Sequence, residues 1–185
     1  MKYTLAQTIA QFEAGEKLKY VFFWGHTVEQ GNITKTCFSQ WYPAPFTVEQ
    51  VTYKTTEHWM MAQKAALFND ADIAAQILQV NQPGEAKALG RKVKSFEAAV
   101  WDAHKYEIVV KGNFHKFSQN PPLKTFLLNT QSRILVEASP VDRIWGIGMA
   151  QDHQDIEVPS RWKGQNLLGF ALMEVRVARE DRASL

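Results

Sequence analysis

Glu57 is the carboxylate whose neighbours in the sequence most favour chemistry. It follows Thr55 and Thr56, which are good helix N-caps, and it opens a run without Gly or Pro that reaches Phe68. The positive end of the helix dipole favours a carboxylate there by about 0.3–1 kcal/mol. Such a group can serve as a general base or stabilise a developing positive charge. The same position also suits a carboxylate that only helps to cap the helix.

Lys64 lies seven residues after Glu57 and on the same side of the predicted helix, about 10 Å further along its axis. The rest of this helix is almost entirely apolar, with Trp59, Met60 and Met61 in its middle, and it is predicted to be buried. Buried charges cost free energy unless they are paired or face a cleft. Two charges on one face of this helix therefore indicate a cleft.

Asp142 is the second carboxylate of interest, and Trp145 lies three residues after it. Gly146 and Gly148 follow closely, which implies a tight loop where the backbone approaches another group. Turn chemistry also explains an Asp shortly after a Pro, so both interpretations of Asp142 stay open.

Arg91 follows a predicted helix stop at Gly90, and Lys92 and Lys94 come directly after it. This basic segment either contacts a phosphate or forms a solvated turn. Trp101 falls about 100° from the apolar stripe of its predicted helix, so we expect it at the edge of the buried face. An indole there either packs in the core or stacks on a flat ring.

The elements that position these residues are predicted to be mostly helices. We expect helices at residues 5–12, 56–68, 71–80, 84–89, 96–117, 121–128 and 170–179, strands at 20–24 and 46–53, a short apolar segment at 134–136, and a mobile polar loop at 151–163. The stripe predicted to face the core in the longest helix is Phe96, Val100, Ala103, Val110, Phe114 and Phe117.

The composition limits the classes of protein that fit. With 185 residues, of which 45% are hydrophobic, the chain suits one globular domain with an ample core. A net charge of +2 gives no strong field for nucleic acid. The single Cys37 excludes an internal disulfide and fits a reducing compartment, while a thiol nucleophile there has little support. Without a long apolar run or a signal-peptide pattern, we expect a soluble, cytoplasmic protein that has no contact with membranes.

Neither a metal nor a cofactor is predicted. The five histidines are scattered along the chain without metal-ligand spacing. The glycine patterns of nucleotide-binding loops are also absent from the sequence.

Six blocks of the chain, in order, resemble the NADAR (YbiA-like) family over roughly residues 20–178. They are Phe38-Ser39, Thr56-Glu57-His58 with Ala62-Gln63-Lys64, Gly90-Arg91, Trp101, Asp142 to Gly148, and Gly164-Gln165-Asn166-Leu167-Leu168-Gly169 leading to Arg176. Each block is weak alone, and the six together are fairly specific. The resemblance implies a single-domain, mostly helical YbiA-like fold with a few short strands around the pocket. It also implies a boundary: residues 1–19 form an N-terminal extension, expected as a docked helix, and residues 20–180 form the family domain.

The resemblance implies an N-glycosidase that cleaves the bond between a ribose carbon and a base nitrogen. It assigns catalysis to Glu57 and Asp142, and it places Trp101, Trp145, Lys64, Arg91, Gly146, Gly148 and Asn166 at the substrate. Substrates attributed to the family are phosphoribosylamino-pyrimidine intermediates of riboflavin synthesis and ADP-ribose on guanine bases. The implied partner is therefore a small phosphoribosyl or ADP-ribosyl compound, or a modified nucleic-acid base. The alternative from another class is a non-catalytic nucleotide-sensing module.

Departures from the family pattern concern substrate choice more than chemistry. Gln40-Trp41 replaces the usual Asn-Phe, and the polar loop at residues 151–163 looks longer. The first twenty residues have no assigned counterpart in the family pattern.

Overall fold

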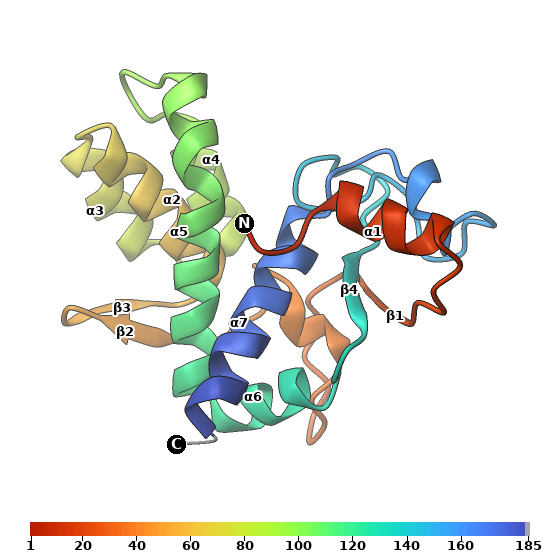
Figure 1. Ribbon diagram of the computed structural model, residues 1–185. Helices are drawn as coiled ribbons and strands as arrows, with labels where there is room; N and C mark the ends of the chain where they lie inside the picture. Colours follow the sequence, from red (N-terminus) through yellow and green to blue (C-terminus); the bar gives the residue numbers. More distant parts are fainter. Residues whose placement is uncertain (184–185) are drawn as a thin grey trace. The chain divides into compact units, whose positions relative to one another are not determined.

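The apolar helix predicted after Thr55 is present as α2, Thr56–Leu67 (Figure 1). This computed structural model describes residues 1–183. The side chain of Thr55 caps α2 by accepting a hydrogen bond from the backbone N–H of His58. Most of α2 is buried, as its apolar composition predicts.

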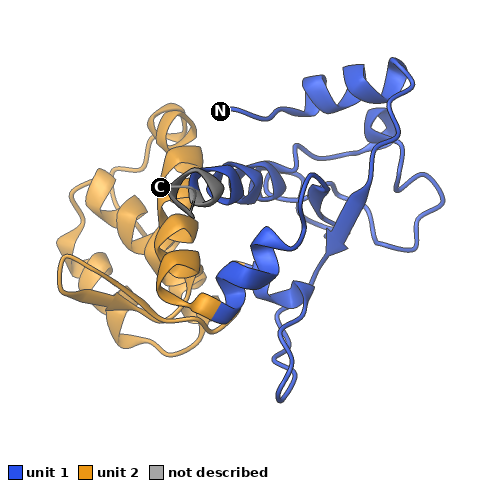
Figure 2. Ribbon diagram, turned by 60° about the horizontal axis from the view of Figure 1, so that its bottom comes forward, with its two compact units in different colours: residues 1–39, 122–185 blue, residues 40–121 orange. Residues whose placement is uncertain are grey.

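The chain forms two compact units (Figure 2). Unit 2 is the continuous segment Gln40–Pro121, and it contains α2. Unit 1 combines Met1–Ser39 with the chain from Pro122 onward. The polypeptide therefore leaves unit 1 once and returns to it once.

In unit 2, α2 packs against α3 (Ala71–Gln79), α4 (Pro83–Gly90) and α5 (Ala98–Gln119). The start of α3 is capped by Asp70, whose Oδ1 accepts from the backbone N–H of Ile73 at 3.2 Å. Its Oδ2 accepts from the N–H of Lys94 at 2.9 Å, which ties the segment after α4 to α3. These hydrogen bonds lower the pKa of Asp70 below its usual value.

The buried face of α5 differs from the predicted stripe. Its buried residues are Val109, Gly112, Asn113, Lys116 and Phe117, whereas Phe96 precedes the helix and is exposed. Of the predicted stripe, Phe117 is buried and Val100, Val110 and Phe114 are partly buried, whereas Ala103 is exposed. The prediction missed Gly112 and Lys116, because the face toward α2 depends on fit as well as on hydropathy. A Cβ at Gly112 would lie 2.3 Å from the indole of Trp59.

The segment predicted as one strand, 46–53, is a hairpin of β2 (Phe46–Val48) and β3 (Val51–Tyr53). Glu49 and Gln50 form its turn, with φ of 48° and 67°. Both residues adopt the left-handed conformation that two-residue hairpin turns require. The alternating side chains of residues 46–53 had predicted one continuous strand, so the turn at Glu49 and Gln50 was missed.

Unit 1 is built on a parallel pair of strands, β1 (Tyr20–Phe23) and β4 (Ile134–Glu137). Helix α7 (Leu167–Ala183) packs against β4. The predicted extension contains α1 (Leu5–Glu13), which contacts the short helix η2 (Pro159–Arg161). A second short helix, η1 (Lys35–Phe38), contacts β1, and α6 (Pro121–Leu128) leads to β4. The predicted polar loop 151–163 thus contains η2 and the buried Trp162, whose indole N–H donates to the carbonyl of Ile156 at 2.8 Å.

The expected fold class is confirmed, because helices predominate and the strands of the described residues are short. Among residues 1–183, none of the helices combines the length and the apolar character that crossing a membrane requires.

Candidate active site

Glu57 lies in the first turn of α2, and only 3% of it is exposed. Its backbone N–H donates to the carbonyl of Gln40 at 3.0 Å, and the hydroxyl of Thr56 donates to the same carbonyl at 3.1 Å. Thr55 supplies the side-chain cap of the helix, so a group other than Glu57 already fills that role. The main chain at Glu57 is therefore held by the carbonyl of Gln40, in addition to the helix cap from Thr55.

Gln40 is itself held by a buried residue of α5. The side-chain amide of Asn113 donates to Oε1 of Gln40 at 2.9 Å and to the carbonyl of Val109 at 3.0 Å. Both amide side chains are buried. The position of the α2 start thus depends on Gln40 and Asn113, although the sequence marked Gln40 only as a departure from the family and gave no sign of Asn113.

His58 is buried directly beside Glu57 in the sequence. Its Nε2 lies 3.2 Å from the carbonyl oxygen of Val80, and its Nδ1 lies 2.8 Å from Oγ1 of Thr55. Because a carbonyl only accepts, Nε2 carries the proton, and the Thr55 hydroxyl donates to Nδ1. Burial lowers the pKa of His58 below its ordinary 6.5, and the carbonyl of Val80 opposes that effect.

We expect the free energy of unfolding to fall as the pH drops below about 6.5, because the unfolded chain then binds a proton at His58 that the folded chain does not. The slope from this one proton approaches about 1.4 kcal/mol per pH unit until the pH reaches the lower folded pKa. Urea unfolding of wild type and His58→Gln at several pH values measures this slope. Identical pH dependence in the two proteins would show that His58 does not contribute.

Lys64, Arg91 and Trp101 lie together in unit 2. The ammonium of Lys64 donates to the carbonyl of Gly90 at 2.9 Å and lies 5.7 Å from the ring centroid of Trp101. It lies 4.3 Å from the ring centroid of Phe96, which is 45% exposed. Burial and, second, the nearby charge of Arg91 lower the pKa of Lys64.

This cluster can bind an anion beside a flat ring. An ammonium has three N–H donors, and Gly90 accepts from one of them. Two neighbouring cations repel each other, so an anion that meets both relieves that cost. The exposed face of Phe96 and the half-buried indole of Trp101 offer stacking surfaces.

In unit 1, Asp142 organises the loop that follows β4. Its Oδ1 accepts from the backbone N–H groups of Trp145 at 2.7 Å, Ile144 at 2.8 Å and Gly146 at 3.5 Å. The hydroxyl oxygen of Ser139 accepts from the N–H of Asp142 at 3.1 Å. The turn chemistry anticipated for Asp142 is present, and its side chain remains half-exposed.

Gly146 and Gly148 are required by the packing of this loop. A Cβ at Gly146 would lie 2.8 Å from the carbonyl oxygen of Glu137, and Gly148 has a φ of 64°. Asn166 is buried, and its side chain accepts from the N–H of Glu137 at 3.0 Å and donates to the carbonyl of Leu135 at 2.9 Å. Its backbone N–H donates to the carbonyl of Gly146 at 3.1 Å. Asn166 therefore fastens the loop to β4.

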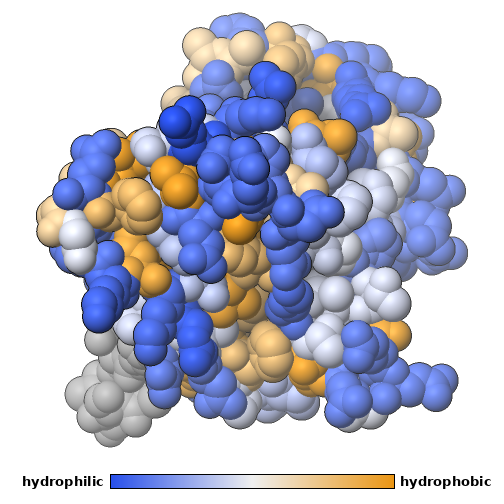
Figure 3. Space-filling model, turned by 90° about the vertical axis from the view of Figure 1, so that its right-hand side faces the viewer, coloured by the Kyte–Doolittle hydropathy of each residue, from blue (hydrophilic) through white to orange (hydrophobic). Residues whose placement is uncertain are grey.

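Trp24 is a candidate that the sequence did not reveal, since residues 20–24 were predicted only as a strand. The N–H of Ala138 donates to the carbonyl of Phe23 at 2.9 Å, so Trp24 and the Asp142 loop leave the same edge of the strand pair. Ligands commonly bind beyond the carboxyl ends of parallel strands. Trp24 is 57% exposed, and apolar side chains also reach the surface in patches between hydrophilic ones on the face in Figure 3.

The predicted site residues thus fall into two groups. Unit 2 holds Glu57, Lys64, Arg91 and Trp101, and the last three are close together. Unit 1 holds Asp142, Trp145, Gly146, Gly148 and Asn166 on one loop and the residue that fastens it.

Comparisons with known proteins agree with the motifs. N-glycosidase R617 of Acanthamoeba polyphaga mimivirus is 43% identical over 164 residues, which cover 85% of this chain and 95% of that protein. N-glycosidase YbiA of Escherichia coli K12 is 32% identical over 139 residues, covering 75% of this chain and 78% of YbiA. The NMR structure of E. coli YbiA matches with a TM-score of 0.71 at 28% identity, covering 89% of this chain and 87% of that structure.

The family domain itself is found over residues 22–178. That range contains every residue assigned to the site and excludes the N-terminal extension. The resemblance drawn from the motifs is confirmed, and the chain belongs to the NADAR domain family.

Proposed function

We propose that this chain, an N-glycosidase like its relatives, hydrolyses the bond between a phosphorylated ribose and a nitrogen base. The substrate class we favour is a phosphoribosylamino-pyrimidine, the kind of intermediate found in riboflavin synthesis. The observation that carries this choice is the cluster of Lys64, Arg91 and Trp101, where two cations adjoin aromatic rings. Such a cluster suits a compound that joins a phosphate to a flat base.

The chemistry assigns a role to each carboxylate. When an N-glycosidic bond breaks, positive charge develops on the sugar ring and negative charge on the departing base. Glu57 stabilises the positive charge or activates the attacking water, and it lies in the first turn of α2, where the helix dipole favours negative charge. Asp142 orients the ribose or assists the departing base, and the reverse division of these roles is the alternative. Water is the only co-substrate of this hydrolysis.

The aromatic residues hold the base in this proposal. Trp101 and Trp145 stack on its faces, and Trp24 is a further stacking residue at the edge where the Asp142 loop begins. Lys64 and Arg91 meet the phosphate. We also propose that the protein is located in the cytoplasm. Its single, buried Cys37 is consistent with a reducing compartment.

Mass spectrometry of reaction products tests the proposal. Purified protein is incubated with a phosphoribosylamino-pyrimidine or with an oligonucleotide that carries ADP-ribose on guanine. We expect ribose 5-phosphate and the free base from the first substrate. Release of ADP-ribose from the second, with the first untouched, would instead assign the enzyme to modified nucleic acid. If the protein bound a substrate but formed neither product, it would be a non-catalytic nucleotide-sensing module.

Arg91→Ala is expected to raise KM for the phosphorylated substrate by about tenfold or more, because an ionic hydrogen bond contributes about 1.5–3 kcal/mol. KM for the dephosphorylated nucleoside should hardly change. Lys64→Met, which keeps the aliphatic stem beside Phe96, should act in the same direction. Steady-state kinetics on both substrates measures the difference.

Lys92→Ala is the matched control, since Lys92 is an exposed cation directly after Arg91. It should leave both KM values unchanged. If Arg91→Ala raised KM equally for both substrates, Arg91 would not bind the phosphate.

A further inference from the structure

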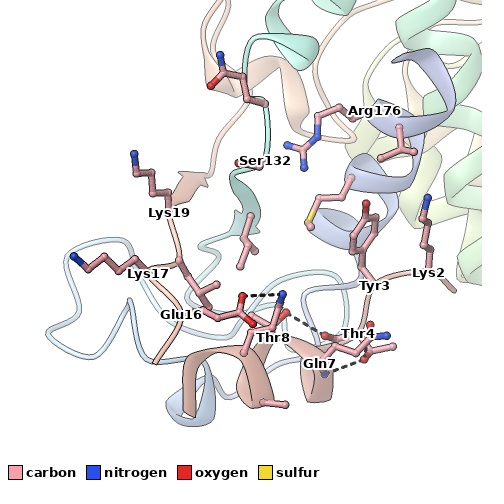
Figure 4. Close-up of a pocket in the computed structure, with 17 residues that line it drawn as sticks. Lys2, Tyr3, Thr4, Gln7, Thr8, Glu16, Lys17, Lys19, Ser132 and Arg176 are labelled. Atoms are coloured by element: carbon pink, nitrogen blue, oxygen red, sulfur yellow. Dashed lines mark hydrogen bonds between the residues drawn. The ribbon is translucent and has the colours of Figure 1, made fainter. Parts of the chain in front are cut away.

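A cavity of about 1180 Å³ lies within unit 1, between the N-terminal extension and the segments around β4 and α7 (Figure 4). Eleven of its seventeen lining residues come from Lys2–Lys19, which precede the family domain at residues 22–178. The others come from the turn before β4, from the first residue of β4 and from α7. None of the residues assigned to hydrolysis lines this cavity, so it is a feature separate from them.

The extension is anchored at both of its ends, and the segment between these anchors supplies most of the cavity lining. At one end, the backbone N–H of Lys2 donates to the carboxylate of Glu174 on α7. At the other end, the N–H of Ile134 donates to the carbonyl of Lys19 at 2.8 Å, directly before β1 pairs with β4. Thr4 caps α1 between them. The cavity wall is therefore held by specific contacts.

Among the lining residues, the cations Lys2, Lys17, Lys19 and Arg176 outnumber the single acid Glu16. The carboxylate of Glu174 lies beside the backbone of Lys2. Arg176 is only 3% exposed, and its Nη1 donates to Oγ1 of Thr130 and to the carbonyl of Arg133, both at 2.8 Å. These bonds fix a permanent cation in the wall. Figure 4 shows Lys17 and Lys19 extending outward, so their flexible side chains stand at the rim.

The rest of the lining combines apolar and hydrogen-bonding groups. Ile134, Met173 and Val177 supply apolar surface, while Tyr3 and Ser132 supply hydroxyls. Small-molecule sites typically span about 300–1,000 Å³ and have mostly apolar linings with a few polar groups. This cavity is large enough for a nucleotide, whose flat base suits the apolar wall and whose phosphates suit the cations.

We infer that the N-terminal extension forms a second binding site, for a nucleotide-sized molecule that carries phosphate. Most of its lining comes from the extension, and the remaining six lining residues belong to the shared domain. It does not depend on which substrate the enzyme hydrolyses.

Hydrogen–deuterium exchange of the full chain, with ADP, adenosine or inorganic phosphate added, tests this site. We expect ADP to slow exchange in residues 1–19 and 131–134. Adenosine and phosphate alone should protect these residues much less. Lys17→Glu/Lys19→Glu should weaken ADP binding at this site by about tenfold or more. Ser132→Trp should block the cavity and abolish the protection without a change of charge.

Lys35→Glu/Lys124→Glu is the matched control, because it makes the same change of charge in unit 1 away from the cavity lining. It should keep the protection by ADP. Absence of protection in residues 1–19, or protection that persists in Ser132→Trp, would overturn the site. Equal protection by adenosine would overturn its preference for phosphate, and equal protection by inorganic phosphate would overturn the nucleotide-sized ligand.

Discussion

Glu57→Gln is expected to abolish turnover while folding and ligand binding persist. Gln keeps the size and hydrogen-bonding capacity of Glu, so α2 should pack as before, with a loss of about 1 kcal/mol or less at the helix start. The variant lacks the negative charge next to a carbon that becomes cationic in the transition state. An interaction made only there lowers kcat and not KM when it is lost. We expect kcat to fall by at least about 10²–10⁴-fold.

Single-turnover kinetics, binding of a product analogue and thermal unfolding, measured on the same protein, separate these effects. Glu107→Gln is the matched control, since it removes one negative charge from an exposed position of α5 in the same unit. It should retain wild-type turnover. Activity of Glu57→Gln within about tenfold of wild type, on a verified substrate, would reduce Glu57 to a structural residue and end the proposed mechanism.

Asp142→Asn is expected to lower kcat by about 10²-fold or more and to leave the loop intact. The Oδ1 of Asn can accept the same hydrogen bonds from the N–H groups of Ile144 and Trp145. Asp142→Ala loses both the charge and these bonds, so it should be as inactive and also less stable by about 1–3 kcal/mol. Comparing kcat with the free energy of unfolding for the two variants separates chemistry from loop structure.

Asp152→Asn is the control for Asp142, because Asp152 is an exposed carboxylate of the following loop. It should behave as wild type. If Asp142 transfers a proton, the pH profile of residual activity in Asp142→Asn should lose one limb. Full activity in Asp142→Asn, with Asp142→Ala impaired only as far as it unfolds, would make Asp142 a turn residue.

The sequence predicted well those features that are encoded locally. The N-cap of α2, the helix end at Gly90 and the tight loop after β4 all follow from neighbouring residue types. Lys64 and Glu57 shared a face because seven residues make two helical turns. These patterns were sufficient to find the two groups of candidate residues.

Features that join distant segments were not predictable in this way. On α5, Gly112 faces α2 because the indole of Trp59 leaves room for nothing larger, and Lys116 is buried near the rings of Tyr42 and Phe117. A hydropathy pattern does not assign glycine or lysine to a buried helix face, so the prediction for α5 omitted Gly112 and Lys116. The bond between Gln40 and Asn113 is likewise invisible to any local pattern.

The order of synthesis has a consequence for how this chain folds. Unit 2 is one uninterrupted segment, so all its contacts can form as soon as Pro121 has left the ribosome. Strand β1 is made early but pairs with β4, and Tyr20 must wait for Ile134. Until then the aromatic strand has an unpaired edge, and closing so long a loop is slow. The nascent chain therefore exposes an unpaired aromatic strand for as long as β1 awaits β4, and such an edge favours aggregation.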